Sequence, residues 1–328
     1  MNSHLLNISP KNWPVLPGDR CTLLFKSLLC EAKTLEESIA PLGCKSEDLL
    51  KAYSFDTLKV ERVHGPEDGT QKILLKTADH YPVESVWLPE SYKNTICLSS
   101  QSGCAYACRF CATGKMGLNR NLDTWEIVDQ VLAWNRLGKK KLSNLVFMGM
   151  GEPLANLDAV LKATDIVADT RGLGLSYRKM TISTVGVTKG IRLLSEQSRQ
   201  INLIVSLHGT TDEQRAVWMP RTPPLKELWE GLRYYQQRSR RRIGIAYLVK
   251  PGFNDSLEDV GRLRELLKDL NFKINLLCHN PINKEDKGTN IEDVEKFRKK
   301  IQGFVQGAVT IRFPAGREDG AACGQLAG

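Results

Sequence analysis

The stretch Cys104-Ala-Tyr-Ala-Cys108-Arg-Phe-Cys111 places three cysteines at the spacing C-x3-C-x2-C. Four cysteines would complete a zinc or iron–sulfur site, whereas three thiolates leave one iron of a [4Fe-4S] cluster open to an outside ligand. A zinc ion that borrows a histidine or a fourth cysteine is the alternative, but structural zinc usually takes paired C-x2-C ligands. The spacing therefore favours Cys104, Cys108 and Cys111 as ligands of a cluster with one open iron, which indicates chemistry rather than scaffolding.

The composition is that of a globular protein: of the 328 residues, 41% are hydrophobic and 25% are charged. This length allows one large core with a smaller appended unit. The sequence has no run approaching the roughly 18 apolar residues of a membrane helix and no signal peptide at its start, so we expect a cytoplasmic protein. The nine cysteines are odd in number and scattered, which favours reduced thiols over a disulfide framework.

Positive charge is concentrated in the larger, carboxy-terminal part of the chain. Residues 1–95 carry 11 Lys/Arg and 13 Asp/Glu, whereas residues 96–328 carry 35 and 24, and the whole chain has a net charge of +9. The densest runs are Lys139-Lys140-Lys141 and Arg238-Ser-Arg240-Arg241-Arg242. Such runs attract phosphates, but runs of like charge are commonly solvated surface. They indicate a nucleic-acid partner only together with other evidence.

Residues 1–94 are predicted to form a small α+β unit. Three prolines, Pro10, Pro14 and Pro17, indicate an irregular lead-in. Apolar spacing and turn signals then predict helices at residues 23–32 and 46–53 and strands at residues 72–76 and 83–88.

From residue 95 to residue 328, strand and helix patterns alternate. Short apolar runs, typical of buried parallel strands, lie at residues 95–98, 144–148, 180–183, 201–207, 243–249, 273–278 and 309–313. Amphipathic helices are predicted at residues 124–137, 157–168, 189–196, 225–238, 257–270 and 291–304. The alternation predicts an α/β fold in which residues 95–328 form a partial (β/α)6 barrel.

Chemically distinctive residues follow the predicted strands. Beyond the cysteine loop, the candidates for binding a ligand are Gly151, Glu152, Ser183, Ser206, Leu207, His208 and Asn280. The carboxyl ends of barrel strands carry active sites, so we expect these residues to meet around one site. Glycine at position 151 lets the backbone approach a ligand, and the Glu152 carboxylate can bind an ammonium group. Taken singly, each residue is also typical of an ordinary polar strand end or connection.

The cysteine spacing after the first barrel strand resembles that of the radical S-adenosylmethionine (SAM) superfamily. That resemblance implies a partial barrel of the radical SAM type. It also implies that the amino and carboxylate groups of SAM chelate the open iron, and that electron transfer from the cluster cleaves SAM to a 5′-deoxyadenosyl radical. Glu152 would then bind the methionine ammonium group.

Longer sequence motifs make the resemblance more specific: the chain resembles the RNA adenine methyltransferases of the RlmN/Cfr family. These motifs are Glu84-Ser-Val-Trp-Leu-Pro-Glu, Cys97-Leu-Ser-Ser-Gln-Ser-Gly-Cys104, Cys111-Ala-Thr-Gly, Gly149-Met-Gly-Glu-Pro-Leu, Ser206-Leu-His, Lys273-Ile-Asn-Leu and Ala-Ala-Cys323-Gly-Gln-Leu. Cys97 and the small-residue tail around Cys323 are specific to this family among radical enzymes. The long, aromatic and Arg-rich amino-terminal adaptor of RlmN-type members is not recognisable, so the chain resembles a divergent member with a shortened amino-terminal region.

The resemblance implies a ping-pong reaction that uses two SAM molecules and a methylated cysteine. Cys323 would accept a methyl group by displacement, lose a hydrogen atom to the radical and add its methylene carbon to adenine. Cys97 would help to deprotonate the adduct and form a disulfide with Cys323, which releases the methylated RNA. Glu84 matches the residue commonly assigned as proton acceptor, although the sequence is equally consistent with a solvated strand glutamate.

We therefore expect methylation of adenine at carbon 2 in 23S ribosomal RNA, with transfer RNA as a second substrate. Methylation at carbon 8, as in Cfr, and a non-catalytic RNA-binding relative are the alternatives. The expected partners are RNA and a small electron donor such as flavodoxin or ferredoxin, and we expect a monomer without membrane contact.

Overall fold

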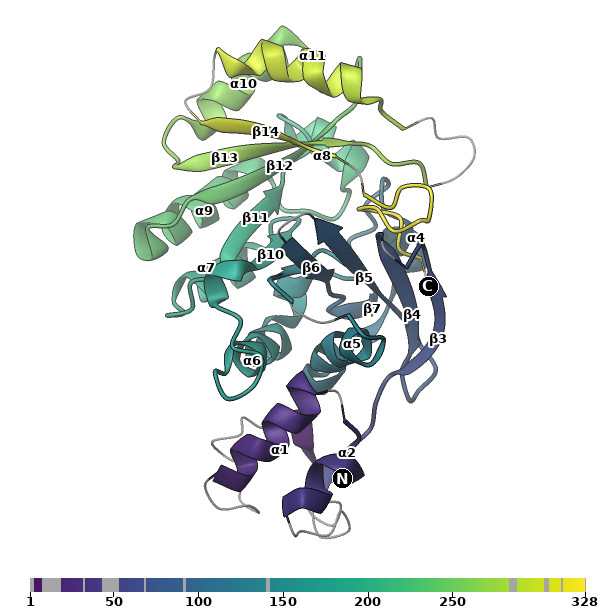
Figure 1. Ribbon diagram of the computed structural model, residues 1–328. Helices are drawn as coiled ribbons and strands as arrows, with labels where there is room; N and C mark the ends of the chain where they lie inside the picture. Colours follow the sequence, from purple (N-terminus) through teal and green to yellow (C-terminus); the bar gives the residue numbers. More distant parts are fainter. Residues whose placement is uncertain are drawn as a thin grey trace.

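The computed structural model describes residues 3–7, 19–31, 33–42, 53–67, 69–90, 93–139, 142–282, 288–303, 307–313 and 315–327. Its main feature is a ten-stranded mixed sheet with the strand order β14-β13-β12-β11-β10-β9-β6-β5-β4-β3 (Figure 1). The three prolines of the lead-in, and all of the predicted helix at 46–53 except its last residue, lie outside the described residues.

Seven neighbouring strands of this sheet run parallel to one another. They are β6 (Lys93–Cys97), β9 (Asn144–Phe147), β10 (Met180–Thr184), β11 (Asn202–Ser206), β12 (Ile243–Val249), β13 (Phe272–Cys278) and β14 (Ala308–Arg312). Every residue of β12 is buried, as expected where helices cover one face of a parallel sheet and the barrel interior the other. The strand bounds agree with the predicted ones to within two residues at each end.

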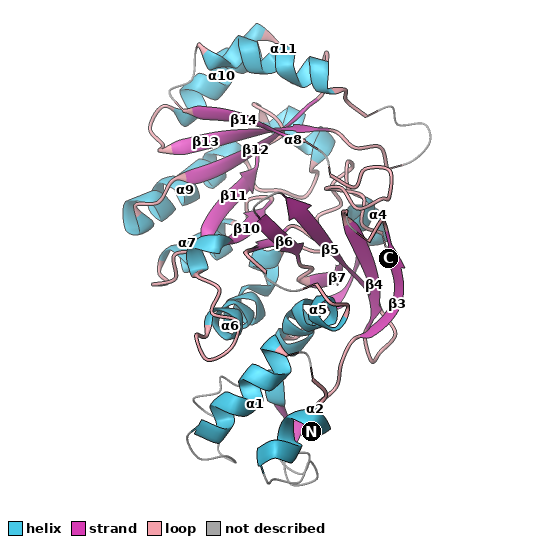
Figure 2. Ribbon diagram, in the orientation of Figure 1, coloured by secondary structure: helices cyan, strands magenta, loops and turns pink. Residues whose placement is uncertain are grey.

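Helices cover the outer face of the parallel strands (Figure 2). The long ones are α5 (Thr124–Arg136), α6 (Leu157–Ala168), α7 (Thr188–Ser195), α9 (Leu225–Ser239), α10 (Leu257–Leu267) and α11 (Ile291–Gln302). Short 3-10 turns lie at η4 (Pro153–Asn156) and η5 (Tyr177–Lys179). Helix α5 begins at a capping box made by Asp123 and Glu126. The α/β partial barrel predicted from the alternation of strands and helices is confirmed.

Three antiparallel strands extend the sheet beyond β6. They are β5 (Pro82–Glu90), β4 (Gln71–Lys76) and β3 (Lys59–His64). Along β4, buried and half-buried residues alternate, because one face of this strand packs on the core. The sheet therefore runs without a break across residues 94 and 95, where the sequence predicts a domain boundary, and that boundary stays a prediction.

The first described segments are β1 (Ser3–His4), η1 (Leu5–Asn7), α1 (Asp19–Cys30), α2 (Leu35–Ile39), η3 (Ala40–Leu42) and β2 (Tyr53–Ser54). Of these, β1, η1 and α1 contact helix α5, and α2 packs on α1. The Asn135 side chain donates a 2.7 Å hydrogen bond to the Leu29 carbonyl of α1. The His4 ring stacks on Trp125 of α5, with 4.3 Å between the ring centroids. None of the helices in the described residues is long and apolar enough to cross a membrane.

Candidate active site

The carboxyl ends of the parallel strands surround a cavity of about 550 Å³. Six thiols line it, those of Cys97, Cys104, Cys108, Cys111, Cys278 and Cys323. Of the predicted ligand-binding residues, those that line it are Gly151, Glu152, Ser183, Ser206, His208 and Asn280. Residues from loops far apart in the sequence therefore meet at one site, as the strand-end argument predicts.

The cysteine loop is held by a hairpin and a short helix that the sequence analysis did not predict. These elements are β7 (Gln101–Gly103), β8 (Leu118–Asn121) and α4 (Ala112–Met116). The Cys104 amide donates a 2.8 Å hydrogen bond to the Gly117 carbonyl, which closes the loop. A Cβ at Gly114 would lie 2.8 Å from both the amide nitrogen and the carbonyl oxygen of Cys108. Only glycine lets α4 pack this closely on the loop.

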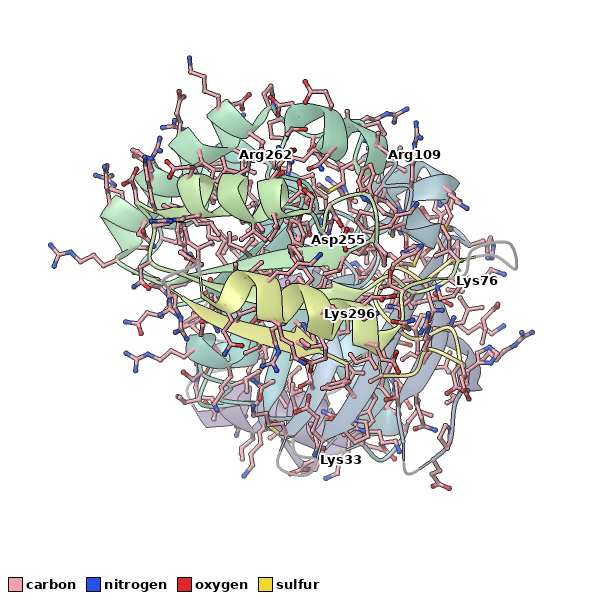
Figure 3. All side chains as sticks on the ribbon, turned by 90° about the horizontal axis from the view of Figure 1, so that it is seen from above. Lys33, Lys76, Arg109, Asp255, Arg262 and Lys296 are labelled. Atoms are coloured by element: carbon pink, nitrogen blue, oxygen red, sulfur yellow. The ribbon has the colours of Figure 1, made fainter. Side chains whose placement is uncertain are left out.

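Helix α8 (Asp212–Trp218), also absent from the prediction, supports the loop from the other side. The Arg109 amide donates to the Trp218 carbonyl at 2.8 Å, while the Arg109 side chain is exposed at the periphery of the molecule (Figure 3). The Arg221 guanidinium donates to the Ala105 carbonyl at 2.8 Å. The loop is thus fixed by its backbone, and its cysteine side chains remain free for ligation.

The three loop thiols are electrostatically coupled and largely buried. Burial, together with the nearby Cys111 thiol and Glu152 carboxyl, raises the pKa of Cys104 to about 11. Burial and the other two thiols raise the pKa of Cys108 further, and burial also raises the pKa of Cys111. Thiols in such surroundings ionise only when a cation binds them. The donor set therefore fits a metal centre.

Within the described ranges, no three His, Cys, Asp or Glu side chains lie close enough together to hold a single metal ion. A zinc ion needs its ligands within bonding distance of one centre, whereas each cysteine of a [4Fe-4S] cluster binds a different iron.

Glu152 lies in the turn after β9, between the cysteine loop and β10. Its carboxylate oxygens accept hydrogen bonds from the Leu154 amide at 3.0 Å and the Val185 amide at 2.9 Å. Gly151 has a φ of +93°, and a Cβ there would lie 2.5 Å from the Cβ of Gln101. Burial raises the pKa of Glu152 to about 7. The oriented carboxylate keeps lone pairs for a cationic ligand in the cavity.

The ends of β10 and β11 place polar groups on the cavity wall. Ser183 and Ser206 are half-buried there. His208 accepts a hydrogen bond at Nδ1 from the Leu248 amide at 3.0 Å, so its Nε2 carries the proton. Burial, with the charge of Arg215, lowers the pKa of His208 to about 3. His208 is therefore a neutral hydrogen-bond donor. Leu207 is fully buried and does not line the cavity.

Arg215 of α8 is a structural residue of the site that the sequence analysis missed. Its guanidinium is buried and donates to the carbonyls of Val185, Ser206 and Leu207 at 3.2, 3.1 and 2.9 Å. It thus joins the ends of β10 and β11 beneath the cavity. An arginine in a short polar helix gives no sequence signal for such a role, because arginine is usually exposed.

The last described segment, residues 315–327, is called the chain end here, and it brings Cys323 to the cavity. The Asn280 side chain donates from Nδ2 to the Cys323 carbonyl at 3.0 Å. The Asn280 Oδ1 atom is buried and has no hydrogen-bond partner within the described residues. This acceptor in the cavity wall is available to a hydrogen-bond donor of a bound ligand. Cys97 and Cys323 both line the cavity as free thiols, Cys323 exposed and Cys97 buried. Burial, with the nearby Cys323, raises the pKa of Cys97 to about 12.

Glu84 lies next to the chain end rather than in the cavity wall. Its carboxylate forms a 2.9 Å ion pair with Lys72 and accepts a 2.9 Å hydrogen bond from the Ala327 amide. The Glu84 side chain is only 4% exposed, so it is not a solvated strand residue. Its assignment as a proton acceptor stays a prediction.

Comparisons with known proteins agree with this geometry. A model of the radical SAM superfamily matches residues 98–267. The chain is 41% identical over 276 residues to the dual-specificity RNA methyltransferase RlmN of Syntrophobacter fumaroxidans, which covers 83% of this chain and 80% of that protein. It is 37% identical over 326 residues to the probable dual-specificity RNA methyltransferase RlmN of Christiangramia forsetii. This alignment covers 95% of this chain and 92% of that protein. The chain belongs to the RlmN family of radical SAM methyltransferases.

A solved structure supports the same family. The crystal structure of a radical SAM methyltransferase from Sphaerobacter thermophilus superposes with a TM-score of 0.90 at 30% identity and covers 98% of each chain. As an RlmN family member, the chain is a radical SAM RNA methyltransferase, and its family uses a [4Fe-4S] cluster and SAM.

Neither Lys139 nor the run Arg238–Arg242 lines the cavity. Arg238–Arg242 joins the end of α9 to the start of β12, at the amino-terminal edge of the strands, opposite the cavity. Lys139 is the one described residue of the other run, and its ammonium group donates to the Glu67 carbonyl. Arg312, at the end of β14, is the arginine that lines the cavity.

Proposed function

We propose that the chain methylates carbon 2 of adenine in 23S ribosomal RNA, and in transfer RNA as a second substrate. The observation that carries this proposal is that Cys97, the three loop cysteines and Cys323 line one cavity. A cluster alone would account for the loop cysteines. The exposed thiol of Cys323 and the buried thiol of Cys97 are explained if Cys323 carries a methyl group and Cys97 forms a disulfide with it to release the product.

Each part of the cavity wall has a role in this proposal. Cys104, Cys108 and Cys111 hold the cluster. The groups that hold SAM are Glu152, Ser183, Ser206, His208 and Asn280, with the backbone of Gly151 and Leu207 shaping their loops. When bound, the cluster and SAM supply the radical that removes a hydrogen atom from a methyl group. Glu152 orients the methionine ammonium group, and the buried Asn280 Oδ1 accepts a hydrogen bond from SAM.

Cys323 carries the carbon in this proposal. Its thiol loses a proton and takes a methyl group from one SAM, which leaves as S-adenosylhomocysteine. After one hydrogen atom has been removed, the carbon bonds to adenine, and the adduct gives up the ring proton and returns one electron to the oxidised cluster. The Cys97 thiol then loses its proton and attacks the sulfur of Cys323 to form a disulfide. The bond between that sulfur and the carbon breaks, and the carbon leaves with the electron pair and takes up a proton to become the methyl group of adenine. Burial keeps the Cys97 thiol protonated before this step, since its pKa is raised to about 12. Glu84, 2.9 Å from the Ala327 amide, is the proposed proton acceptor.

The target adenine has to leave its base stack to reach such an enclosed site. At the cavity mouth, Phe313 is 69% exposed, and Arg312 lies beside it. An exposed aromatic ring next to a guanidinium suits a flipped base and its phosphate. A small electron donor such as flavodoxin or ferredoxin would supply the electron, and we propose that the chain acts as a monomer in the cytoplasm.

A nucleoside digest of RNA tests the proposal. Cells that lack this gene would be complemented with the wild type, with Cys323→Ala or with Cys278→Ala, and RNA nucleosides would be measured by mass spectrometry. Wild type and Cys278→Ala, which removes another thiol of the same cavity, should yield 2-methyladenosine, and Cys323→Ala should yield none. Methylation by Cys323→Ala would overturn the role of Cys323. A carbon-8 product would replace the carbon-2 assignment, and an unmethylated RNA with an intact cluster would indicate a non-catalytic RNA-binding relative.

A further inference from the structure

The chain end, residues 315–327, lies between two parts of the molecule that are distant in sequence. On one side are strands β4 and β5, and on the other is the cysteine loop with helix α4 (Figure 1). The loop side is held by backbone contacts: the Ala112 amide donates to the Gly324 carbonyl at 2.7 Å, and Thr113 Oγ1 donates to the Leu326 carbonyl at 2.5 Å. The chain end is thus fixed to the first two residues of helix α4, which follows Cys111.

The strand side is held by a buried ion pair. The Lys72 ammonium group of β4 lies 2.9 Å from the Glu84 carboxylate of β5, and their side chains are 13% and 4% exposed. The second carboxylate oxygen of Glu84 accepts the Ala327 amide at 2.9 Å. A Cβ at Gly320 would lie 3.6 Å from Lys72 Nζ, so the chain end runs directly over this ammonium group. Across the described residues, Lys72 is the only cation that forms an ion pair with Glu84.

We propose that Lys72 is a positioning residue: through Glu84 it anchors the chain end and so places Cys323 in the cavity. Neighbouring strands bring Lys72 and Glu84 together, because Leu74 pairs with Glu84 in the antiparallel register and Lys72 lies two residues away on the same face. The antiparallel extension of the sheet therefore acts as a docking platform for the segment that carries Cys323. The proposal concerns placement, and its bearing on catalysis rests on the proposed role of Cys323.

Removing the charge of Lys72 leaves the Glu84 carboxylate buried without its cation. A buried charge in that state is strongly unfavourable, so Glu84 either takes up a proton or turns toward water. In both cases its hydrogen bond to Ala327 weakens, since charge-assisted bonds are the stronger ones. The chain end then opens more often. The cysteine loop keeps the bonds that do not involve the chain end, from the Cys104 amide to Gly117 and from the Arg109 amide to Trp218.

Hydrogen–deuterium exchange of the full chain without cofactors or RNA tests the anchor directly. Lys72→Met should raise the exchange rate of the Ala327 amide and its neighbours about tenfold. Weakening the hydrogen bond between Ala327 and Glu84 lets this segment open more often, and amide hydrogens exchange from the open state. Lys76→Met is the matched control on the same strand. Lys76 pairs at 3.5 Å with Glu61 and is 37% exposed. Lys72→Arg, which keeps the charge, should restore most of the protection. Equal exchange in Lys72→Met and Lys76→Met would overturn the proposal.

A second variant covers the case in which Lys72→Met does not fold. Truncation after Leu326 removes the Ala327 donor and leaves the ion pair of Lys72 and Glu84 in place. The truncated chain should show the same faster exchange over residues 320–326, whereas unchanged exchange would contradict an anchor at Ala327.

Assays of the reconstituted enzyme distinguish a positioning role of Lys72 from general damage to the fold. In Lys72→Met, iron content and SAM cleavage should match wild type, while the ratio of 5′-deoxyadenosine formed to adenine methylated should rise at least fivefold. Lys72→Met also disturbs Glu84, the proposed proton acceptor, so the exchange rates, and not this ratio, test the placement of Cys323. A parallel loss of iron and cleavage would instead indicate general damage and contradict a positioning role. The exchange result does not depend on methylation, so the anchor and the proposed role of Cys323 can fail separately.

Discussion

The Ala112 amide, one residue beyond the third loop cysteine, donates a 2.7 Å hydrogen bond to the Gly324 carbonyl, one residue beyond Cys323. More than two hundred residues of sequence separate these two backbone groups. Their contact links the proposed cluster site to the proposed methyl carrier through the backbone rather than through side chains. The position of Cys323 is therefore coupled to the structure of the cysteine loop.

Gly324→Ala should separate Cys323 from the loop. Gly324 has a φ of +87°, and a Cβ there would lie 2.7 Å from the Phe110 carbonyl oxygen. The backbone of the chain end must move away to accept the methyl group. We expect adenine methylation to fall at least tenfold, while the melting temperature stays near that of wild type because only the chain end is displaced. Methylation assays and thermal unfolding would measure both effects.

Gly252→Ala is the control for this substitution. Gly252 has a φ of +74°, but nothing lies within 4 Å of a Cβ at that position. It therefore tests the cost of a positive φ, about 1 to 3 kcal/mol, without a close approach. Equal losses of methylation in the two variants would mean that Gly324 is needed only for its backbone conformation.

Much of the barrel could be predicted from the sequence because its strands are short apolar runs separated by amphipathic helices. The loop cysteines could be predicted because their spacing is local. Strand β3 was missed, since its residues are half-buried or exposed and show no alternation. Helix α8 was missed because it is only seven residues long and buries an arginine.

The parts that the sequence could not predict depend on contacts between distant residues. Glu84 appears in a recognisable phrase, yet its burial and its bond to Ala327 arise only when the chain end folds back onto β5. Lys72 looks like an ordinary strand lysine. Leu207 sits between two residues that line the cavity, but its side chain is fully buried and packs in the hydrophobic core.

Glu152 predicts a pH dependence of stability in the cofactor-free chain. Burial raises its pKa from the ordinary 4.5 to about 7. Between these values the folded state keeps a proton that the unfolded chain loses, so the contribution of Glu152 to the free energy of unfolding falls as the pH rises and levels off above about 7. His208, whose pKa is lowered to about 3, contributes in the opposite direction up to its ordinary value of 6.5.

Comparison with Glu152→Gln isolates the first contribution, because His208 is common to both proteins. Urea unfolding from about pH 5 to about pH 8 should show that the stability difference, wild type minus variant, decreases with rising pH. A constant difference across this range would show that Glu152 is ionised throughout.

Arg215→Met should damage both stability and SAM binding. The buried guanidinium donates to three carbonyls at the ends of β10 and β11, and methionine removes all three bonds, although the Leu207 carbonyl also accepts the Gly209 amide at 2.8 Å. The expected loss is about 2 to 4 kcal/mol of the free energy of unfolding. SAM binding should weaken at least tenfold, since Ser206 and His208 lie on the loop that Arg215 holds.

Arg233→Met is the control: Arg233 is 48% exposed and pairs with Asp269 at 3.6 Å, so its loss should cost less than about 0.5 kcal/mol. Similar urea midpoints for the two variants would contradict the structural role of Arg215, and unchanged SAM affinity would show that the strand ends keep their shape without it.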